Sequence, residues 1–178
     1  MKNLLVLIIA LFAFFGCGED ESSNANFKEF SPNEEVKLVD VSGKELTLVR
    51  KDHGFAIKND ENKVLMIDIF GTFCPPCQKE AAELTKYQLE NKDKFTLIGL
   101  THFENVTNEY VLHEFMQKFN AYYFITNDQK INDRLAEQIV RDIEYKHEIA
   151  LPFKVVIKNG EYQILTDVDS GQYGVKYY

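Results

Sequence analysis

The residues best suited to chemistry in this sequence are two cysteines, Cys74 and Cys77, which are separated by Pro75 and Pro76. The apolar run 64–70 precedes them and an amphipathic pattern follows, so the pair should lie where a buried strand leads into a helix. A helix N-terminus carries partial positive charge and unpaired N–H groups, and both stabilise a thiolate. Proline suits the first helical positions because its missing N–H needs no partner there. The stretch therefore predicts thiol–disulfide exchange.

The remaining cysteine and the histidines give no support for a metal centre. The chain has three cysteines, and a structural zinc site needs four ligands, which a single pair does not supply. We expect no metal, and no cofactor other than the Cys74–Cys77 disulfide itself. The dispersed histidines are interpreted as surface or turn residues: His53, His102, His113 and His147.

The N-terminal region has the pattern of an export signal. Lys2 precedes the apolar run 4–15, which is too short to span a bilayer as a helix, and Gly16-Cys17 follows. This order predicts a signal peptide over residues 1–16. Gly16-Cys17 resembles the attachment site of bacterial lipoproteins, which implies a lipid anchor on Cys17. Ordinary secretory cleavage, which would leave a soluble periplasmic protein, is the alternative.

Composition divides the rest of the chain into a tether and one domain. After Cys17, the segment up to residue 35 is polar and predicts a flexible tether. Residues 36–178 suit one domain with one core. The formal net charge is −8 and the basic residues are scattered, so nucleic acid is not an expected partner.

Hydrophobic periodicity predicts the elements that must position the cysteines. The predicted strands are 36–41, 46–49, 55–57, 64–70, 95–100, 122–126, 153–158 and 162–165, and the predicted helices are 76–89, 107–119 and 130–143. Asn159-Gly160 predicts a two-residue hairpin turn between the last two strands. Strands alternating with helices and ending in a hairpin predict an α/β domain with a central mixed β-sheet flanked by helices.

The cysteine motif resembles a known family. Residues 70–77, Phe-Gly-Thr-Phe-Cys-Pro-Pro-Cys, are similar to the redox motif of the TlpA/ResA branch of thioredoxin-like proteins, which are membrane-tethered bacterial thiol–disulfide oxidoreductases. Glu80, the Leu151-Pro152 segment and the closing hairpin also match the branch. The resemblance covers roughly residues 30–170 and implies a thioredoxin-like fold with an N-terminal β-hairpin extension.

The sequence also departs from the pattern of this branch. Phe70 and Phe73 stand where the branch usually has tryptophan, and Phe153-Lys154 replaces a common Thr-Thr. The stretch 127–150 looks longer than usual. These differences leave the redox motif intact and bear on the choice of partner.

The resemblance assigns roles to the two cysteines. Cys74 is the expected attacking thiol and the more exposed of the two, and Cys77 would resolve the mixed disulfide. Phe73 and Pro75, on either side of Cys74, are expected to contact the substrate. The alternatives are two buried unreactive cysteines or half of a metal site.

Two acidic residues are expected to assist the thiols. Asp68 resembles the buried acid of thioredoxin, which relays protons to the second cysteine, and burial should raise its pKa. No lysine occurs in 95–100 to pair with it. Glu80 is expected to tune the thiols. The alternatives are a tolerated polar residue at the strand end for Asp68 and a solvated surface acid for Glu80.

The Leu151-Pro152 segment is expected to form part of the substrate site. The resemblance implies a cis peptide bond before Pro152, close to the cysteines. The backbone of Leu151 would then pair with a bound peptide as an added strand. A trans proline at the start of an edge strand is the alternative.

Together these features predict an envelope enzyme. The preferred function is reduction of exported protein thiols, including apocytochrome c during cytochrome c maturation, with electrons from an inner-membrane thiol carrier. The expected location is the periplasmic side of the cell envelope, with the lipid on Cys17 in the inner rather than the outer membrane. The alternatives are a thiol oxidase or isomerase, and a non-enzymatic copper-binding or interaction lipoprotein.

Overall fold

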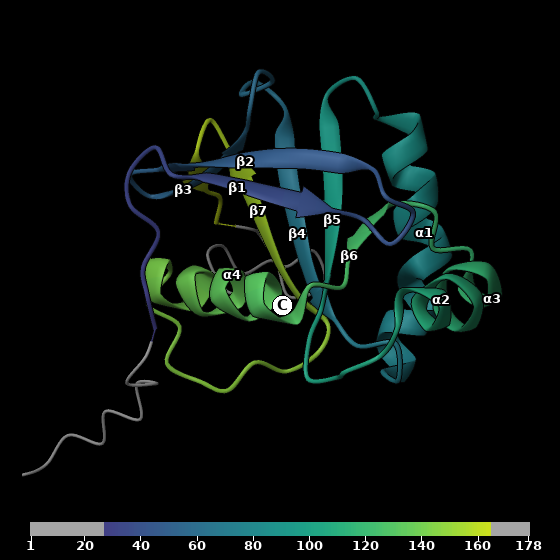
Figure 1. Ribbon diagram of the computed structural model, residues 1–178. Coiled ribbons are helices and arrows are strands. Elements are labelled where there is room, and N and C mark those ends of the chain that lie inside the picture. Colours follow the sequence, from purple (N-terminus) through teal and green to yellow (C-terminus); the bar gives the residue numbers. More distant parts are fainter. Residues whose placement is uncertain (1–26, 165–178) are drawn as a thin grey trace, which may run out of the picture.

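The computed structural model describes residues 27–164 in two β-sheets and the helices around them (Figure 1). The predicted signal peptide, Cys17 and the first part of the tether lie outside the described residues, as does Leu165. Within residues 27–164, no helix has both the length and the apolar character that are needed to cross a membrane.

The central sheet has five strands in the order β6-β5-β4-β7-β8. Its strands are β4 (Val64–Phe70), β5 (Phe95–Thr101), β6 (Phe124–Thr126), β7 (Phe153–Lys158) and β8 (Glu161–Tyr162). β4 lies at the centre, parallel to β5 and antiparallel to β7. The sheet is therefore mixed, as predicted. β6 and β8 are shorter than the predicted strands.

The turn between β7 and β8 follows the sequence signal. Asn159 and Gly160 have φ angles of 56° and 80°. Positive φ at both central residues is the requirement of a type I′ turn, which Asn-Gly meets at low cost.

The N-terminal hairpin forms a separate antiparallel sheet of three strands, β1 (Glu35–Val39), β2 (Glu45–Lys51) and β3 (Gly54–Ile57). The predicted extension is therefore present and includes the short strand predicted at 55–57.

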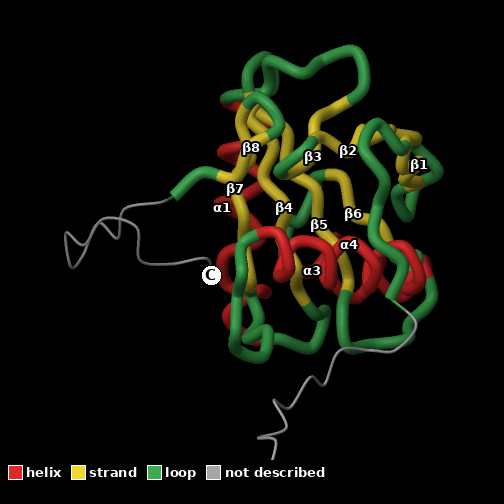
Figure 2. Tube along the Cα trace, turned by 90° about the vertical axis from the view of Figure 1, so that its left-hand side faces the viewer, coloured by secondary structure: helices red, strands yellow, loops and turns green. Residues whose placement is uncertain are grey.

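Two long helices lie on opposite faces of the central sheet. Figure 2 shows α1 (Pro75–Glu90) on one side and α4 (Gln129–Asp142), with the three-stranded sheet, on the other. The single helix predicted over 107–119 is instead three helical pieces: α2 (Asn108–Tyr110), a π-helical turn η1 (Val111–Met116) and α3 (Gln117–Phe119). It ends at Asn120, whose left-handed conformation (φ 54°) is a common helix stop.

The alternation of side chains along β4 divides the core in two. Leu65, Ile67 and Ile69 pack in the cluster shared with α4, whereas Phe70 packs in the cluster that contains Cys77 and Ala81 of α1. Because successive strand residues face opposite sides, Asp68 shares the α1 side with Phe70.

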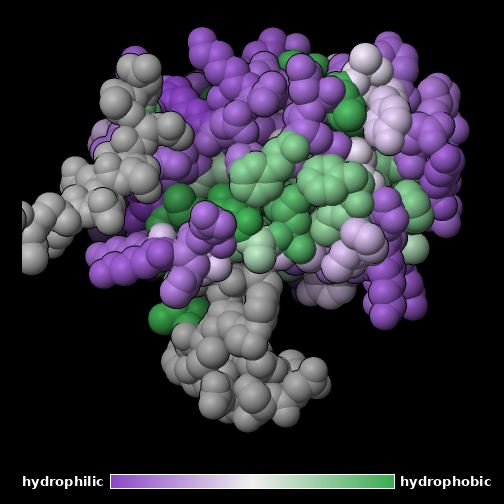
Figure 3. Space-filling model, turned by 90° about the horizontal axis from the view of Figure 1, so that it is seen from below, coloured by the Kyte–Doolittle hydropathy of each residue, from purple (hydrophilic) through white to green (hydrophobic). Residues whose placement is uncertain are grey.

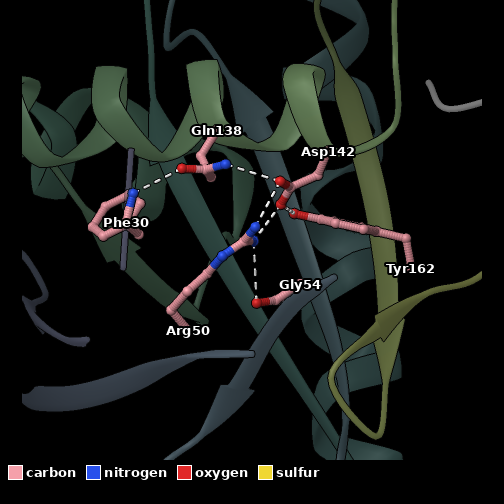
Figure 4. Close-up of polar contacts among 6 residues, drawn as sticks. All are labelled: Phe30, Arg50, Gly54, Gln138, Asp142 and Tyr162. Carbon is pink, nitrogen blue, oxygen red and sulfur yellow. Dashed lines mark hydrogen bonds and ion pairs between the residues drawn. The ribbon is translucent and has the colours of Figure 1, made fainter. Parts of the chain in front are cut away.

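A buried ion pair joins the three-stranded sheet to α4 (Figure 4). The Arg50 guanidinium forms a bidentate pair with Asp142, with one N–H···O distance of 2.8 Å, and both side chains are almost fully buried. Asp142 also accepts hydrogen bonds from Tyr162 at 2.9 Å and Gln138 at 2.8 Å. Arg50 in addition donates to the Gly54 carbonyl at 3.3 Å. One carboxylate therefore links β2, α4 and β8.

Candidate redox site

The two cysteines lie at the junction that the sequence predicted, between β4 and the N-terminus of α1. They form a disulfide, with their Cα atoms 5.3 Å apart. Cys74 is the N-cap residue of α1, with extended φ and ψ of −84° and 113°, and Pro75 and Pro76 occupy the first helical positions. The Cys77 amide donates to Cys74 Sγ at 3.4 Å. Cys74 Sγ therefore takes the place of the usual capping oxygen, next to the positive end of the helix dipole.

Both cysteines are buried in the disulfide form. Cys74 is 5% exposed and Cys77 is 2% exposed, so the predicted difference in access between them is small. Phe73 is 56% exposed, and its ring lies over Gly71, where an added Cβ would be 2.6 Å from Phe73 Cε1. The glycine thus permits an aromatic side chain to lie at the surface directly before Cys74.

Hydrogen bonds that the sequence did not predict hold the loop before Cys74. The Thr72 amide donates to Glu104 Oε1 at 2.8 Å, and the Thr72 hydroxyl also donates to this carboxylate. Gln78 Nε2 donates to the Thr72 carbonyl at 2.7 Å, and the Cys74 amide donates to the Gly71 carbonyl at 3.0 Å. The loop is thereby fixed both to α1 and to the segment that follows β5.

Asp68 is buried on the α1 side of β4 and pairs with a lysine from a neighbouring strand. It is 1% exposed, and the register of β4 and β7 places Lys154 directly opposite it. Lys154 Nζ lies 3.1 Å from Asp68 Oδ1. Burial raises the pKa of Asp68 from 3.8 to about 6; the charge of Lys154 opposes this rise and that of Glu80 adds to it.

Lys154 also forms an ion pair with Glu80 of α1. The side chains of Asp68, Lys154 and Glu80 are 1%, 15% and 32% exposed, respectively. Glu80 follows Cys77 by three residues, a spacing that places both on one side of α1. The structure therefore brings Asp68 and Glu80 together through Lys154. The sequence showed the unusual Lys154 but gave no sign of its partners.

On β5, the other strand next to β4, the residue that pairs with Asp68 is a glycine. Gly99 of β5 pairs with Asp68, and a Cβ there would lie 2.9 Å from Phe70 Cε1 and 3.0 Å from Tyr123 Cε2. Burial, with smaller effects from Asp68 and Glu80, raises the pKa of Tyr123 well above its usual value. The lysine thus reaches Asp68 from β7 because aromatic rings fill the space on the β5 side.

The Leu151–Pro152 peptide bond is cis, as the resemblance implies. Leu151 is partly buried and packs against both core clusters. This places the segment between the two sides of the sheet, directly before β7. The roles of Leu151, Phe73 and Pro75 in substrate binding stay predictions.

The surface at this end of the molecule has an apolar area, which Figure 3 shows from below. Besides Phe73, the loop after β5 exposes Phe103, which is 61% exposed and has a φ of 60°. A positive φ is uncommon for a bulky residue and indicates that surrounding contacts fix the loop. The neighbouring Thr72–Glu104 hydrogen bonds are such contacts.

The prediction that all four histidines lie at the surface or in turns is wrong for His102. The His102 side chain is mostly buried at the end of β5, where its Nδ1 lies 2.9 Å from Asp133 Oδ1. Burial lowers the pKa of His102, and Asp133 opposes this effect. His53, His113 and His147 are exposed. Across residues 27–164, no three His, Cys, Asp or Glu side chains are grouped so as to hold a metal ion.

Comparison with solved structures identifies the fold. The chain is similar to the thioredoxin domain of a thiol-disulfide oxidoreductase from Bacteroides vulgatus, with a TM-score of 0.51 and 17% identity over 76% of this chain and 85% of that chain. The protein has the thioredoxin fold. It is also similar to a protein from Bacteroides thetaiotaomicron described as a putative protein disulfide isomerase, with a TM-score of 0.53 and 22% identity over 77% of each chain.

A thiol:disulfide interchange protein of the thioredoxin family from Chlorobium tepidum gives a TM-score of 0.51 at 18% identity, over 74% of this chain and 81% of that chain. No family model and no curated protein matches the sequence. At these identities the likeness establishes the thioredoxin fold, and the chemistry must be argued from the site.

Proposed function

We propose that this protein is a thiol–disulfide oxidoreductase of the bacterial cell envelope that reduces disulfides in exported proteins. The observation that carries the proposal is the position of Cys74 as N-cap of α1, one turn from Cys77 and bonded to it. A thiolate at a helix N-terminus is stabilised and can attack a disulfide at neutral pH.

The reaction follows from the pair. The Cys74 thiolate attacks one sulfur of a target disulfide, which forms a mixed disulfide and releases the other target sulfur as a thiol. The Cys77 thiolate then attacks Cys74 Sγ and releases the second target thiol. The target gains two electrons and two protons, and the protein ends with the Cys74–Cys77 disulfide that the structure contains.

The location and the partners of the enzyme form part of the proposal. The export pattern of residues 1–16 and the lipid site at Cys17 support attachment to the periplasmic side of the inner membrane. From there the domain would take electrons from a membrane thiol carrier. The resemblance of the cysteine motif supports apocytochrome c as one substrate. The exposed Phe73 and Phe103 supply an apolar surface for such unfolded or flexible chains.

Trapping of mixed disulfides tests the proposal. In cells, we expect Cys77→Ser to accumulate exported proteins bound to Cys74 through a disulfide, because resolution needs the Cys77 thiolate. The matched variant Cys74→Ser should trap little. Equal trapping by both variants would contradict the assigned roles, and no trapped exported protein would contradict the function.

The reduction potential distinguishes a reductase from an oxidase. A reductase should have a potential near that of thioredoxin, about −270 mV, whereas a strong periplasmic oxidant lies near about −120 mV. Equilibration of the purified domain with glutathione buffers measures this value. A potential near about −120 mV would favour the oxidase over the proposed reductase.

A further inference from the structure

A groove of about 1280 Å³ lies along α4, and the exchange between the two cysteines does not by itself require it. Its lining includes Phe103, from the loop after β5, and Ile149, from the segment before β7. Ala136 and Val140 of α4 add apolar side chains, as does Phe27. A concave surface with apolar lining and a few polar groups is typical of a binding site.

The loop that carries Phe103 lies against the loop before the first cysteine. The His102 amide donates to the Phe70 carbonyl at 2.8 Å. Glu104 accepts hydrogen bonds from both the amide and the hydroxyl of Thr72. These bonds on either side of Phe103 hold it beside the redox loop.

The segment before β7 connects the groove to the redox site in a second way. Ile149 lines the groove and is followed closely by Leu151, which the cis peptide bond joins to Pro152. Leu151 packs against the cluster that contains Cys74 and Cys77. The groove therefore lies between two segments that both border the disulfide.

Phe103 has a conformation that a bulky side chain rarely adopts. Its φ is 60° and it is 61% exposed. A residue with a Cβ is crowded by its own backbone at such angles, whereas glycine adopts them freely. The ring packs on His102, with 4.0 Å between the ring centroids, and His102 pairs with Asp133 of α4. Because most of the Phe103 side chain remains in water, folding gives no reason for a phenylalanine here, and contact with a bound molecule does.

The charged residues of the groove do not call for a charged ligand. Three of them are already paired within the protein: Asp133 with His102, Arg134 with Glu34, and Glu137 with Arg141. The other charged or titratable residues of the lining are exposed, of both signs, and can keep their polar ends in water: Lys28, Lys130, His147 and Glu148. The apolar side chains therefore decide what the groove can hold.

We propose that this groove binds a large apolar side chain of the target polypeptide, close in sequence to the target cysteine, and that Phe103 is the residue that recognises it. The inference rests on the proposed exchange at Cys74 and names its class of target: flexible chains with an aromatic or large aliphatic residue near the disulfide. While the target sulfur meets Cys74, this side chain packs between Phe103 and Ile149.

Short peptides with a single cysteine test the proposal on the purified reduced protein. The cysteine is joined by a disulfide to 2-nitro-5-thiobenzoate, a good leaving group. The Cys74 thiolate attacks the peptide sulfur, a Cys74–peptide disulfide forms, and the coloured thiolate leaves with the electron pair of the broken bond. In a glycine–serine background, phenylalanine or serine is placed at one position at a time, within about four residues of the cysteine on either side, a span that can reach the groove.

The measured quantity is the ratio of the second-order rates for the phenylalanine and serine peptides at each position. For the wild type we expect a ratio of about ten at one or two positions, because partial burial of a phenyl ring stabilises the complex by that factor. In Phe103→Gly the ratio should fall to about two or less, because one wall of the groove is lost. Ile149→Ser should lower the ratio at the same positions.

Tyr122→Ser is the matched control. Tyr122 is also an exposed aromatic residue, at 54%, but it precedes β6, whereas Phe103 follows β5, which is parallel to β6. The two residues therefore lie at opposite ends of the sheet, and the control should keep the ratio of the wild type. Because each ratio compares two peptides on the same variant, a partial loss of folded protein cancels.

Two results would overturn the proposal: a wild-type ratio near one at every position, or a ratio in Phe103→Gly equal to that of the wild type. Both are separate from a failure of the proposed function. If the serine peptides did not react with the reduced wild type at all, the exchange reaction itself would be contradicted, and this inference with it.

Discussion

Replacement of Asp68 by asparagine should make the oxidised protein more stable at neutral pH. A carboxyl whose pKa is higher in the folded than in the unfolded state binds protons more tightly when folded, so stability falls as the pH rises between the two values. For Asp68 these values are 3.8 and about 6. At about 1.4 kcal/mol for each pH unit, the ionised carboxylate costs about 3 kcal/mol of folding free energy at pH 7.

The gain should depend on pH in a defined way. Below about pH 3 the carboxyl is protonated in both states, so Asp68→Asn should differ little from the wild type there. The difference should grow as the pH rises and become constant above about pH 7. Lys154 retains Glu80 as a partner in this variant, so no cation is left unpaired.

Urea unfolding of the disulfide form at several pH values measures this effect. Asp93→Asn is the control, because Asp93 is exposed and its replacement changes the net charge equally. The control should shift stability by no more than about 0.5 kcal/mol. If Asp68→Asn were no more stable at pH 7 than the wild type, or if its gain did not vary with pH, the assigned burial and ionisation of Asp68 would be wrong.

Two further predictions concern a buried ion pair of the fold and the glycine beside Asp68. Arg50→Met leaves Asp142 as a buried unpaired charge, so the free energy of unfolding should fall by about 3–5 kcal/mol, and adding Asp142→Leu should recover much of it. Thermal and urea unfolding measure both variants; a loss in Arg50→Met below about 1 kcal/mol would show that the pair is solvated. Gly99→Ala should cost about 1–3 kcal/mol, because its Cβ would lie 2.9 Å from Phe70 Cε1. An unchanged urea midpoint would mean that the aromatic rings move aside freely.

The energetic cost of Asp68 gives a reason to regard it as functional. A buried carboxyl that lowers stability at neutral pH does not contribute to folding, and an apolar residue would fit the strand better. Its pKa near the working pH is the property that a proton acceptor needs. The interpretation of Asp68 as a tolerated polar residue at a strand end does not fit its 1% exposure.

Much of the architecture follows from local sequence. The strand over 64–70 and the start of α1 at Pro75 lie where hydrophobic periodicity and the proline pair placed them. The turn at Asn159-Gly160 follows from the conformations that these two residues allow. The π-helical turn at Val111–Met116 was not predicted, because the apolar pattern fits a regular helix and a helix with one widened turn equally well.

The candidate site was predicted only in part, because some of its contacts join segments that are distant in the sequence. The sequence places Cys74 and Cys77 at a strand–helix junction, and the resemblance to thioredoxin and to the TlpA/ResA branch adds Asp68 and Glu80. In the sequence, Lys154 stands out only as a departure from the pattern of the branch, and the strand 95–100 offers no lysine to Asp68. The hydrogen bonds of Glu104 to Thr72 could not be predicted, because they join two loops that are distant in the sequence.

The sequence by itself determined the elements, the position of the cysteines at a helix N-terminus and the faces on which side chains lie. These properties depend on residues a few positions apart, which periods of two and 3.6 describe. Only the tertiary structure decided that β7, rather than β5, supplies the lysine to Asp68. That choice depends on the register between β4 and β7 and on the aromatic rings packed over Gly99. Strand order, and the register between strands that no short turn connects, arise from contacts between distant segments.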